Sequence, residues 1–195
     1  MKKILSALVV LCLLVPAVNA QSTHLSPKSV GVSFFLNDFV SAQRIRTTSL
    51  VQVVSDKKFA KFSDMNAGMA VSYYRGLSKY VDMATTLGGS FLRYPMPGRT
   101  NYTSKLLLEI NAGLNLNVVT DDYFVQPFLY AGVSAHRYGP HYGATLPLGG
   151  GLKFNIMREA SVVFSTTYKT PVTTETANYH FQHSIGIVAP VGKKK

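Results

Sequence analysis

Apolar and polar side chains alternate along residues 106–118 with a single break. In "LLLEINAGLNLNV" each even position is leucine, isoleucine, alanine or valine, whereas the odd positions from Glu109 to Asn117 are polar residues or glycine. Leu107 is the exception. A repeat of two residues is that of a β-strand, and asparagine and glycine are poor helix formers. The stretch therefore predicts a strand with one apolar and one polar face.

The same alternation recurs, with more noise, along the rest of the chain. Further predicted strands cover 29–38, 66–74, 80–92, 125–136, 144–156, 160–169 and 181–191. Short turns at 76–79, 120–123 and 157–159 alternate with longer links at 38–65, 93–103, 137–143 and 170–178. Strands joined in this way predict an all-β fold, an eight-stranded antiparallel up-and-down transmembrane β-barrel with its short turns on the periplasmic side.

The residue types on the polar face indicate which side of the wall meets lipid. A water-facing sheet is rich in Lys, Glu and Arg, but the polar positions here are mostly Gly, Ser, Thr, Asn and Ala. Small neutral residues suit the crowded interior of an eight-stranded barrel. We therefore expect the apolar face to point outward. Aromatic residues near the strand ends, among them Tyr94, Tyr102, Tyr138, Tyr168 and Tyr179, are expected to form a girdle at the outer rim.

Composition supports a membrane protein without spanning helices. The chain is 47% hydrophobic and 15% charged, whereas a soluble domain draws about 25% of its residues from the charged types. No segment after the N-terminal 20 residues holds 18 consecutive apolar residues. A closed barrel is the remaining way to satisfy backbone hydrogen bonds in hydrocarbon.

The N-terminus predicts export. Two lysines precede an apolar run over 4–15, and Val18-Asn19-Ala20 fits a cleavage site. We expect a cleaved signal peptide at 1–20 and a barrel domain at 21–195, located in the bacterial outer membrane. The one cysteine, Cys12, lies within the signal, so the mature chain is expected to have no disulfide or thiol chemistry.

Three stretches carry a resemblance to a known family. The start "VGVSFFLNDF", the strand-turn-strand "SYYRGLSKYVDM" and the ending "FQHSIGIVAPVGKKK" resemble the N-terminal barrel of OmpA-like outer-membrane proteins, in particular the Bacteroidetes-type branch. The resemblance covers 28–195. Two-domain members of that family continue into a peptidoglycan-binding domain. This chain ends at Lys195, so it is expected to lack that domain, and peptidoglycan anchoring is not carried over.

Charged side chains on the inward face of the predicted strands form a candidate site. They are Asp82, Glu109, Lys153 and Lys169. A buried charge is costly unless it is paired. Counted from the turns, Asp82 and Lys153 lie at one height and Glu109 and Lys169 at another, which predicts a lower and an upper pair. Separate hydration of the four groups is the alternative. Estimated hairpin registers place Gly88 and Gly132 beside Glu109.

The link 38–65 is unusually long, and such loops are usually functional or disordered. Its basic residues are Arg44, Arg46, Lys57, Lys58 and Lys61. "VSAQRI" is expected to form one or two helical turns, and "SLVQVV" with "KFAKF" to extend the sheet. The basic side chains suit contact with lipopolysaccharide phosphates, but a solvated loop is the favoured interpretation.

Catalysis is not expected, although lipid A modification or another reaction of an outer-membrane barrel enzyme is an alternative. Such chemistry needs a serine, a histidine base and a carboxylate within hydrogen-bond reach. His183 and Ser184 are adjacent, so they point to opposite faces of a strand. Ser134 and His136 share a face but have no evident acid beside them.

The favoured function is structural: envelope integrity, or surface interaction through the external loops. A narrow passive channel is a further alternative. No cofactor or metal is expected, because His136, His141 and His180 have no carboxylate among them. Expected partners are outer-membrane lipid, lipopolysaccharide and, during insertion, the barrel-assembly machinery, and the chain is expected to be monomeric. The formal charge of +11 is scattered and comes without a nucleic-acid-binding motif, so no nucleic acid is expected.

Overall fold

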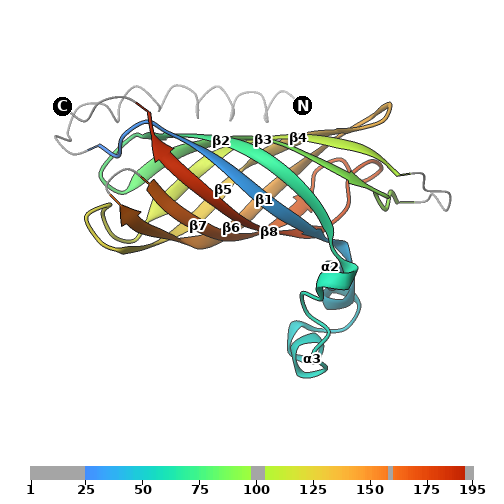
Figure 1. Cartoon of the computed structure of the whole chain (residues 1–195). Coiled ribbons are helices and arrows are strands. Elements are labelled where there is room, and N and C mark those ends of the chain that lie inside the picture. The colour runs from blue at the N-terminus through green and yellow to red at the C-terminus, as the bar shows by residue number, and fades with distance from the viewer. Residues whose placement is uncertain (1–24, 98–103, 158–159, 192–195) are drawn as a thin grey trace, which may run out of the picture.

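The computed structural model describes residues 25–97, 104–157 and 160–191, so the predicted signal peptide with Cys12 lies outside the described residues. Within these ranges the strands form a closed barrel in which each strand pairs with the next and β8 pairs with β1 (Figure 1). The strands are β1 (Ser29–Asp38), β2 (Asn66–Gly76), β3 (Val81–Leu92), β4 (Lys105–Asn117), β5 (Val125–Tyr138), β6 (His141–Met157), β7 (Ala160–Pro171) and β8 (His180–Pro190). The predicted eight-stranded up-and-down antiparallel barrel is confirmed. In the described part of the chain, no helix has the length and apolar character needed to cross a bilayer.

The barrel is apolar outside and polar inside. Along β4, Leu108 and Ile110 are exposed, whereas Glu109 and Asn111 are buried. The other strands follow the same rule. Exposed wall residues include Val32, Phe34, Met69, Val71, Leu87, Leu114, Leu129, Val133, Leu148, Ile185 and Ile187. The expected direction of the apolar face is therefore confirmed.

The two ends of the barrel differ in their connections. At one end, here called the turn end, β1 begins, β8 ends, β6 ends and β7 begins, and the connections 77–80 and 118–124 join their strands. At the opposite loop end lie the connections 39–65, 139–140 and 172–179, together with 93–97 and 104, the described residues between β3 and β4. Short and long connections thus alternate along the chain, with one departure from the prediction.

That departure is the link expected over 137–143, which is strand for most of its length. β5 and β6 continue until Tyr138 pairs with His141, and Gly139 and Pro140 alone form the turn. Gly139 has a φ of 58°, which glycine adopts without steric cost. The prediction of a loop here was wrong. The polar and aromatic residues on either side of Gly139 and Pro140 belong to the strands, and these two residues are enough to close the hairpin.

The connection 39–65 is folded and partly helical. It contains α2 (Phe39–Thr47), α3 (Leu50–Ser55) and a 3₁₀ turn, η2 (Phe62–Asp64). The Asp38 side chain accepts a hydrogen bond from Ser41 N at 2.8 Å and caps α2. The helical prediction for "VSAQRI" is confirmed. The predicted sheet extension by "SLVQVV" is wrong, because Ser49 caps α3 by accepting from Gln52 N and Val53 is buried.

The expected aromatic girdle at the outer rim forms only in part. Tyr168 and Tyr179 stack with ring centroids 6.1 Å apart. Tyr94 and Tyr138 are instead buried, so placing them in the girdle was wrong. Tyr138 lies two residues from inward-facing His136 on β5, so strand parity directs it inward. Tyr94 follows the end of β3, and its N–H donates to Tyr138 Oη at 3.3 Å. Tyr102 lies outside the described residues.

Glycines allow close approach of β4 and β5 around the inward Tyr130. Gly113 pairs with Gly132, and a Cβ at Gly113 would lie 2.5 Å from the Ala131 carbonyl oxygen and 2.8 Å from Gly132 Cα. Backbone atoms at such distances cannot move aside without disturbing the strand pairing. At outward Gly89, by contrast, the nearest atom is a leucine methyl at 3.7 Å.

We expect Gly113→Ala to destabilise the refolded barrel by about 1–3 kcal/mol through overpacking, whereas Gly89→Ala leaves stability nearly unchanged. Urea unfolding in detergent micelles, followed by circular dichroism, measures both variants. Equal stability of the two variants would contradict the close packing described here.

Candidate functional site

Glu109 on β4 and Lys169 on β7 meet inside the barrel, although they lie 60 residues apart in the chain. Lys169 Nζ forms an ion pair with Glu109 Oε1, and the two side chains are 1% and 4% exposed. The predicted upper pair is therefore present. It bridges the lumen between strands that are not neighbours in the sheet.

Further hydrogen bonds surround the Glu109 carboxylate. Ser134 Oγ on β5 donates to Oε1 at 2.7 Å, and Gln182 Nε2 on β8 donates to Oε2 at 3.5 Å. A buried ion pair is stable only when such hydrogen bonds satisfy the capacity that remains after pairing. Glu109 thus connects four of the eight strands through a single carboxylate.

Of the two residues predicted to lie beside Glu109, one does and one does not. Gly88 on β3 pairs with Glu109, as predicted. Gly132 does not: it faces Gly113, and His136 stands opposite Glu109 on β5. The estimate failed because the hairpin is asymmetric at its turn: Asn117, the last residue of β4, pairs with Phe128 and not with Val125, the first residue of β5, and this shifts the register.

The lower pair is not a direct contact. Asp82 is buried and accepts a hydrogen bond from Asn117 Nδ2 at 2.7 Å. Among the described residues, no ion pair within 4.0 Å joins Asp82 to Lys153, although Lys153 lies within electrostatic range of Asp82 and Asp121. Sequence reasoning missed Asn117 as a partner. Its odd position on β4, which it shares with Glu109, is the signal that places it inside.

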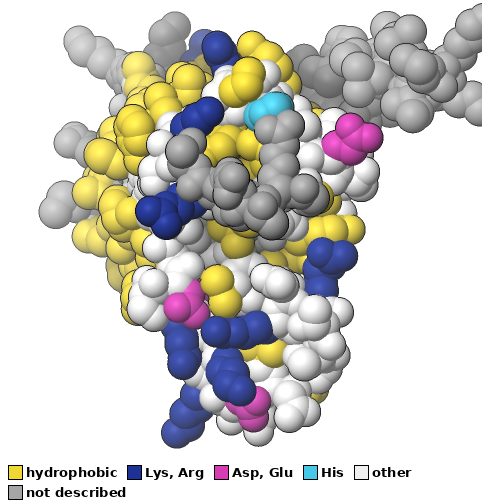
Figure 2. Space-filling view, turned by 90° about the vertical axis from the view of Figure 1, so that its right-hand side faces the viewer, with side chains coloured by type: hydrophobic (Ala, Val, Ile, Leu, Met, Phe, Trp, Pro, Cys, Tyr) yellow, Lys and Arg dark blue, Asp and Glu magenta, His cyan; other side chains and the backbone are white. Residues whose placement is uncertain are grey.

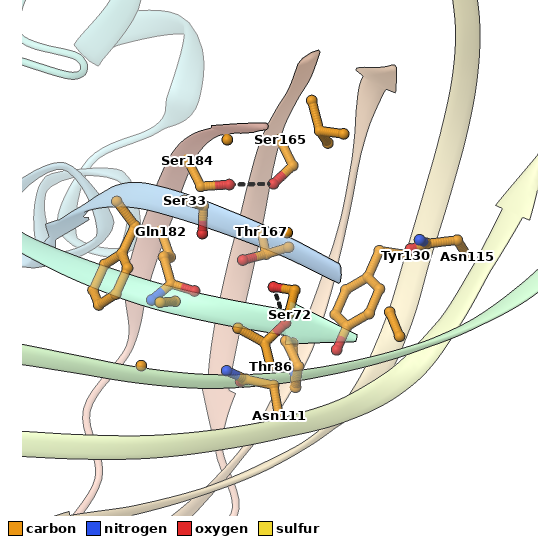
Figure 3. Close-up of a pocket in the computed structure, with 18 of the residues that line it drawn as sticks. Ser33, Ser72, Thr86, Asn111, Asn115, Tyr130, Ser165, Thr167, Gln182 and Ser184 are labelled. Atoms are coloured by element: carbon orange, nitrogen blue, oxygen red, sulfur yellow. Dashed lines mark hydrogen bonds between the residues drawn. The ribbon is translucent and has the colours of Figure 1, made fainter. Parts of the chain in front are cut away.

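A small cavity lies in the barrel (Figure 3). It has a volume of about 90 Å³, and Glu109 and Lys169 are among its lining residues. Its hydroxyl groups pair across strands: Ser72 with Thr86 at 2.8 Å, and Ser165 with Ser184 at 2.7 Å. Ligand pockets usually measure about 300–1,000 Å³, so this cavity is of a size for water molecules rather than for a substrate.

Apolar and aromatic side chains cap the lumen between Glu109 and the loop end. This apolar cap consists of Phe39, Leu92, Tyr94, Met96, Leu107 and Tyr138. Tyr138 Oη donates to the Leu92 carbonyl at 3.1 Å and accepts from Tyr94 N at 3.3 Å. Leu107, the break in the alternation of β4, belongs to this cap, and this break is the sequence signal from which the cap could have been predicted.

Two of the three histidines that were considered as metal ligands lie inside the barrel. His136 and His180 flank the Tyr94 ring, with centroids at 5.3 and 6.5 Å, and both are buried. His141 is the first residue of β6, at the turn with β5. Over the described ranges, no group of three or more histidine, cysteine or carboxylate side chains is placed to hold a metal ion.

The candidate nucleophiles are engaged in other contacts. Ser134 donates its hydroxyl hydrogen to Glu109 rather than to His136. Ser184 points inward and pairs with Ser165, while His183 on the outer face pairs with Thr166 at 3.0 Å. The expectation that Ser134 and His136 have no acid beside them was wrong, because Glu109 lies beside both, but its carboxylate is paired with Lys169.

The basic residues of the long loop have separate roles. Arg44 forms an ion pair with Asp64 at 3.3 Å, and Arg46 lies 3.7 Å above the Tyr179 ring. Lys58 pairs with Asp56 at 3.0 Å. Lys57 and Lys61 are exposed. Figure 2 shows Lys and Arg side chains gathered on the part of the molecule that projects below the barrel.

Comparisons with known proteins identify the fold. No protein-family model matches the chain, and no curated protein matches it. Solved structures of eight-stranded outer-membrane barrels do share the architecture.

Three of these structures cover most of the chain. Neisserial surface protein A has a TM-score of 0.56 at 15% identity, covering 86% of this chain and 99% of that chain. The N-terminal β-barrel domain of Pseudomonas aeruginosa OprF has a TM-score of 0.52 at 12% identity, with 84% and 97% covered. Ail of Yersinia pestis has a TM-score of 0.53 at 10% identity, with 86% and 100% covered. At these identities the likeness extends to the fold alone.

Removing one partner of a buried ion pair leaves the other charge uncompensated. We therefore expect Lys169→Met to destabilise the barrel by about 3–5 kcal/mol. The double variant Glu109→Gln/Lys169→Met should recover much of this loss, so that the effects of the single substitutions do not add. Urea unfolding measures the cycle, with Lys57→Met as a surface control. Additive losses would show that the two groups are energetically independent.

Proposed function

We propose that this chain is a structural β-barrel protein of the bacterial outer membrane, contributing to envelope integrity or to surface interactions through its loop end. The observation that carries the proposal is the inverted polarity of the barrel, with apolar side chains exposed around the wall and polar and charged ones buried. An apolar surface of this extent is unfavourable in water and is satisfied by lipid.

The closure of the wall supports a monomer. Because β1 pairs with β8, no barrel strand presents a free edge to a second copy. Lipid and lipopolysaccharide are then the main neighbours, and the barrel-assembly machinery is the partner during insertion. Placement within the Bacteroidetes-type branch of the OmpA-like barrels is part of this proposal and rests on the sequence resemblance. Two of the structural neighbours are named for the surface and for attachment, which agrees with a role at the loop end.

A conducting channel is disfavoured by the contents of the lumen. The Glu109–Lys169 pair crosses it, and the apolar cap lies beyond that pair toward the loop end. Lipid A chemistry is disfavoured by the engagement of Ser134 and Ser184 in other hydrogen bonds. The function is therefore assigned to the outer surface of the barrel and to its loops.

The membrane assignment is tested by fractionation and electrophoresis. We expect the protein in the outer-membrane fraction, with migration in detergent gels that changes on heating, as is usual for a barrel that resists detergent until it is boiled. Recovery in the soluble periplasm would refute the assignment.

A charge on the lipid-facing wall provides a second test. Leu129 is exposed in the middle of β5, and Leu129→Arg should destabilise the barrel in lipid vesicles by about 2–4 kcal/mol. Thr174→Arg, in the connection 172–179, is the matched control and should have little effect. A water-exposed wall would tolerate both substitutions equally.

Electrical recordings in planar bilayers test the sealed lumen. We expect no steady conductance from the unmodified barrel, and none from Glu109→Ala/Lys169→Ala, because the apolar cap still closes the lumen beyond the ion pair. Steady conductance from the unmodified barrel would favour the channel function instead.

A further inference from the structure

The helical connection 39–65 leaves the barrel sideways. In Figure 1, α2 and α3 project from the side of the barrel near its loop end rather than along its axis. Phe59 packs against Phe181 and His183 of β8, with ring centroids 5.6 and 6.2 Å apart. Gln182 and Ser184 line the lumen, so Phe181 and His183 lie on the outer face of the wall. Apart from Phe39, which belongs to the apolar cap, the connection is therefore folded against the wall and not over the lumen.

The point of contact is the aromatic girdle of the loop end. Tyr168 packs against Phe181 at 4.8 Å and stacks with Tyr179 at 6.1 Å. The Arg46 guanidinium lies 3.7 Å from the centre of the Tyr179 ring. Aromatic girdles mark the depth at which a barrel passes from hydrocarbon to headgroups. The helical connection is thus held at that depth.

Internal contacts hold the connection in one shape. Ala42 and Val53 are buried, and Ser41 Oγ accepts a hydrogen bond from Ala60 N at 2.9 Å. Arg44 donates to the Lys58 carbonyl at 3.0 Å and pairs with Asp64. Because α2 and α3 are fixed in this way, the apolar side chains left outside cannot turn inward as a group.

Those side chains are unusually exposed for their type. Val51 is 79% exposed and Phe62 is 81% exposed, and Leu50 and Val54 are more than half exposed. They are accompanied by basic residues: 39–65 contains five Lys or Arg and two Asp, a net charge of +3. The face of the projection seen in Figure 2 is mostly dark blue and white, with little yellow. Apolar side chains combined with lysines and arginines are typical of segments that lie in a membrane interface.

We propose that 39–65 is a membrane-surface anchor that binds the phosphorylated headgroups of lipid A in the outer leaflet around the barrel. This inference rests on the proposed outer-membrane function. Leu50, Val51, Val54 and Phe62 enter the boundary between headgroups and acyl chains. Lys57 and Lys61, which have no acidic partner among the ion pairs of the described residues, meet the phosphates.

Site-specific fluorescence tests the depth of the anchor. In the full chain carrying Cys12→Ser, Val51→Cys or Phe62→Cys is labelled with a polarity-sensitive dye, and the barrel is refolded into vesicles of lipid A and brominated phosphatidylcholine. We expect several-fold stronger quenching at these positions than at Glu175→Cys in the connection 172–179. Val54→Cys gives the same test if one variant does not refold. Equal quenching at all positions would overturn the proposal.

A charge comparison tests the lipid headgroup. Quenching at position 51 should be stronger in vesicles that contain lipid A than in phosphatidylcholine alone. Lys57→Asn/Lys61→Gln should abolish this difference; asparagine is chosen because Lys57 has a φ of 54°. Lys28→Gln, at the turn end, removes a charge elsewhere and should preserve the difference. Its persistence in the double variant would overturn the role of the two lysines.

Heat-modifiable migration of each sample separates the two levels of the proposal. A barrel that migrates as folded while its labels at 51 and 62 remain in water overturns the anchor alone. Failure of the unmodified chain to form a heat-modifiable barrel overturns the proposed function and the anchor together.

Discussion

The need to pair every backbone N–H and C=O within the chain determines this structure. β1 and β8 meet that need by pairing with each other, which closes the sheet. Closure with this number of strands leaves a narrow interior. Large inward side chains are therefore accommodated only where the facing positions are small, as where Gly113 and Gly132 make room for Tyr130. The small and polar residues of the inner face follow from this lack of space.

In such an interior, a charge has to be satisfied by protein. The Glu109 carboxylate draws hydrogen-bond donors from β5, β7 and β8, which ties together strands that the sheet itself does not pair. The apolar cap lies between this pair and the loop end and includes Phe39, the first residue of α2. The interior side chains thus stabilise the barrel, and the surface that other molecules can contact is the outer one.

The sequence predicted well which side chains point into the barrel, because this depends on odd or even position along a strand. It predicted poorly which residues of different strands lie at the same position along the barrel axis. A period of two identifies strands and assigns Glu109 and Lys169 to the inside without knowledge of any contact. The partner of Asp82 and the neighbour of Glu109 on β5 depend on the length of each turn and on the shear of the barrel, which are not local properties. "SLVQVV" misled for another reason: its β-branched residues favour a strand, but the Ser49 cap and the burial of Val53 decide for a helix.

The helical connection also has a bearing on how the wall closes. It follows β1 directly, yet Phe59 touches β8 and Phe39 stacks near His180, with ring centroids 4.6 Å apart. It therefore straddles the seam where the first strand meets the last. The residues that it touches on β8 lie near the end of the barrel sequence, so these contacts link the first connection of the barrel to its last strand. The connection therefore adds side-chain contacts across the junction of β1 and β8 to the strand pairing that closes the barrel.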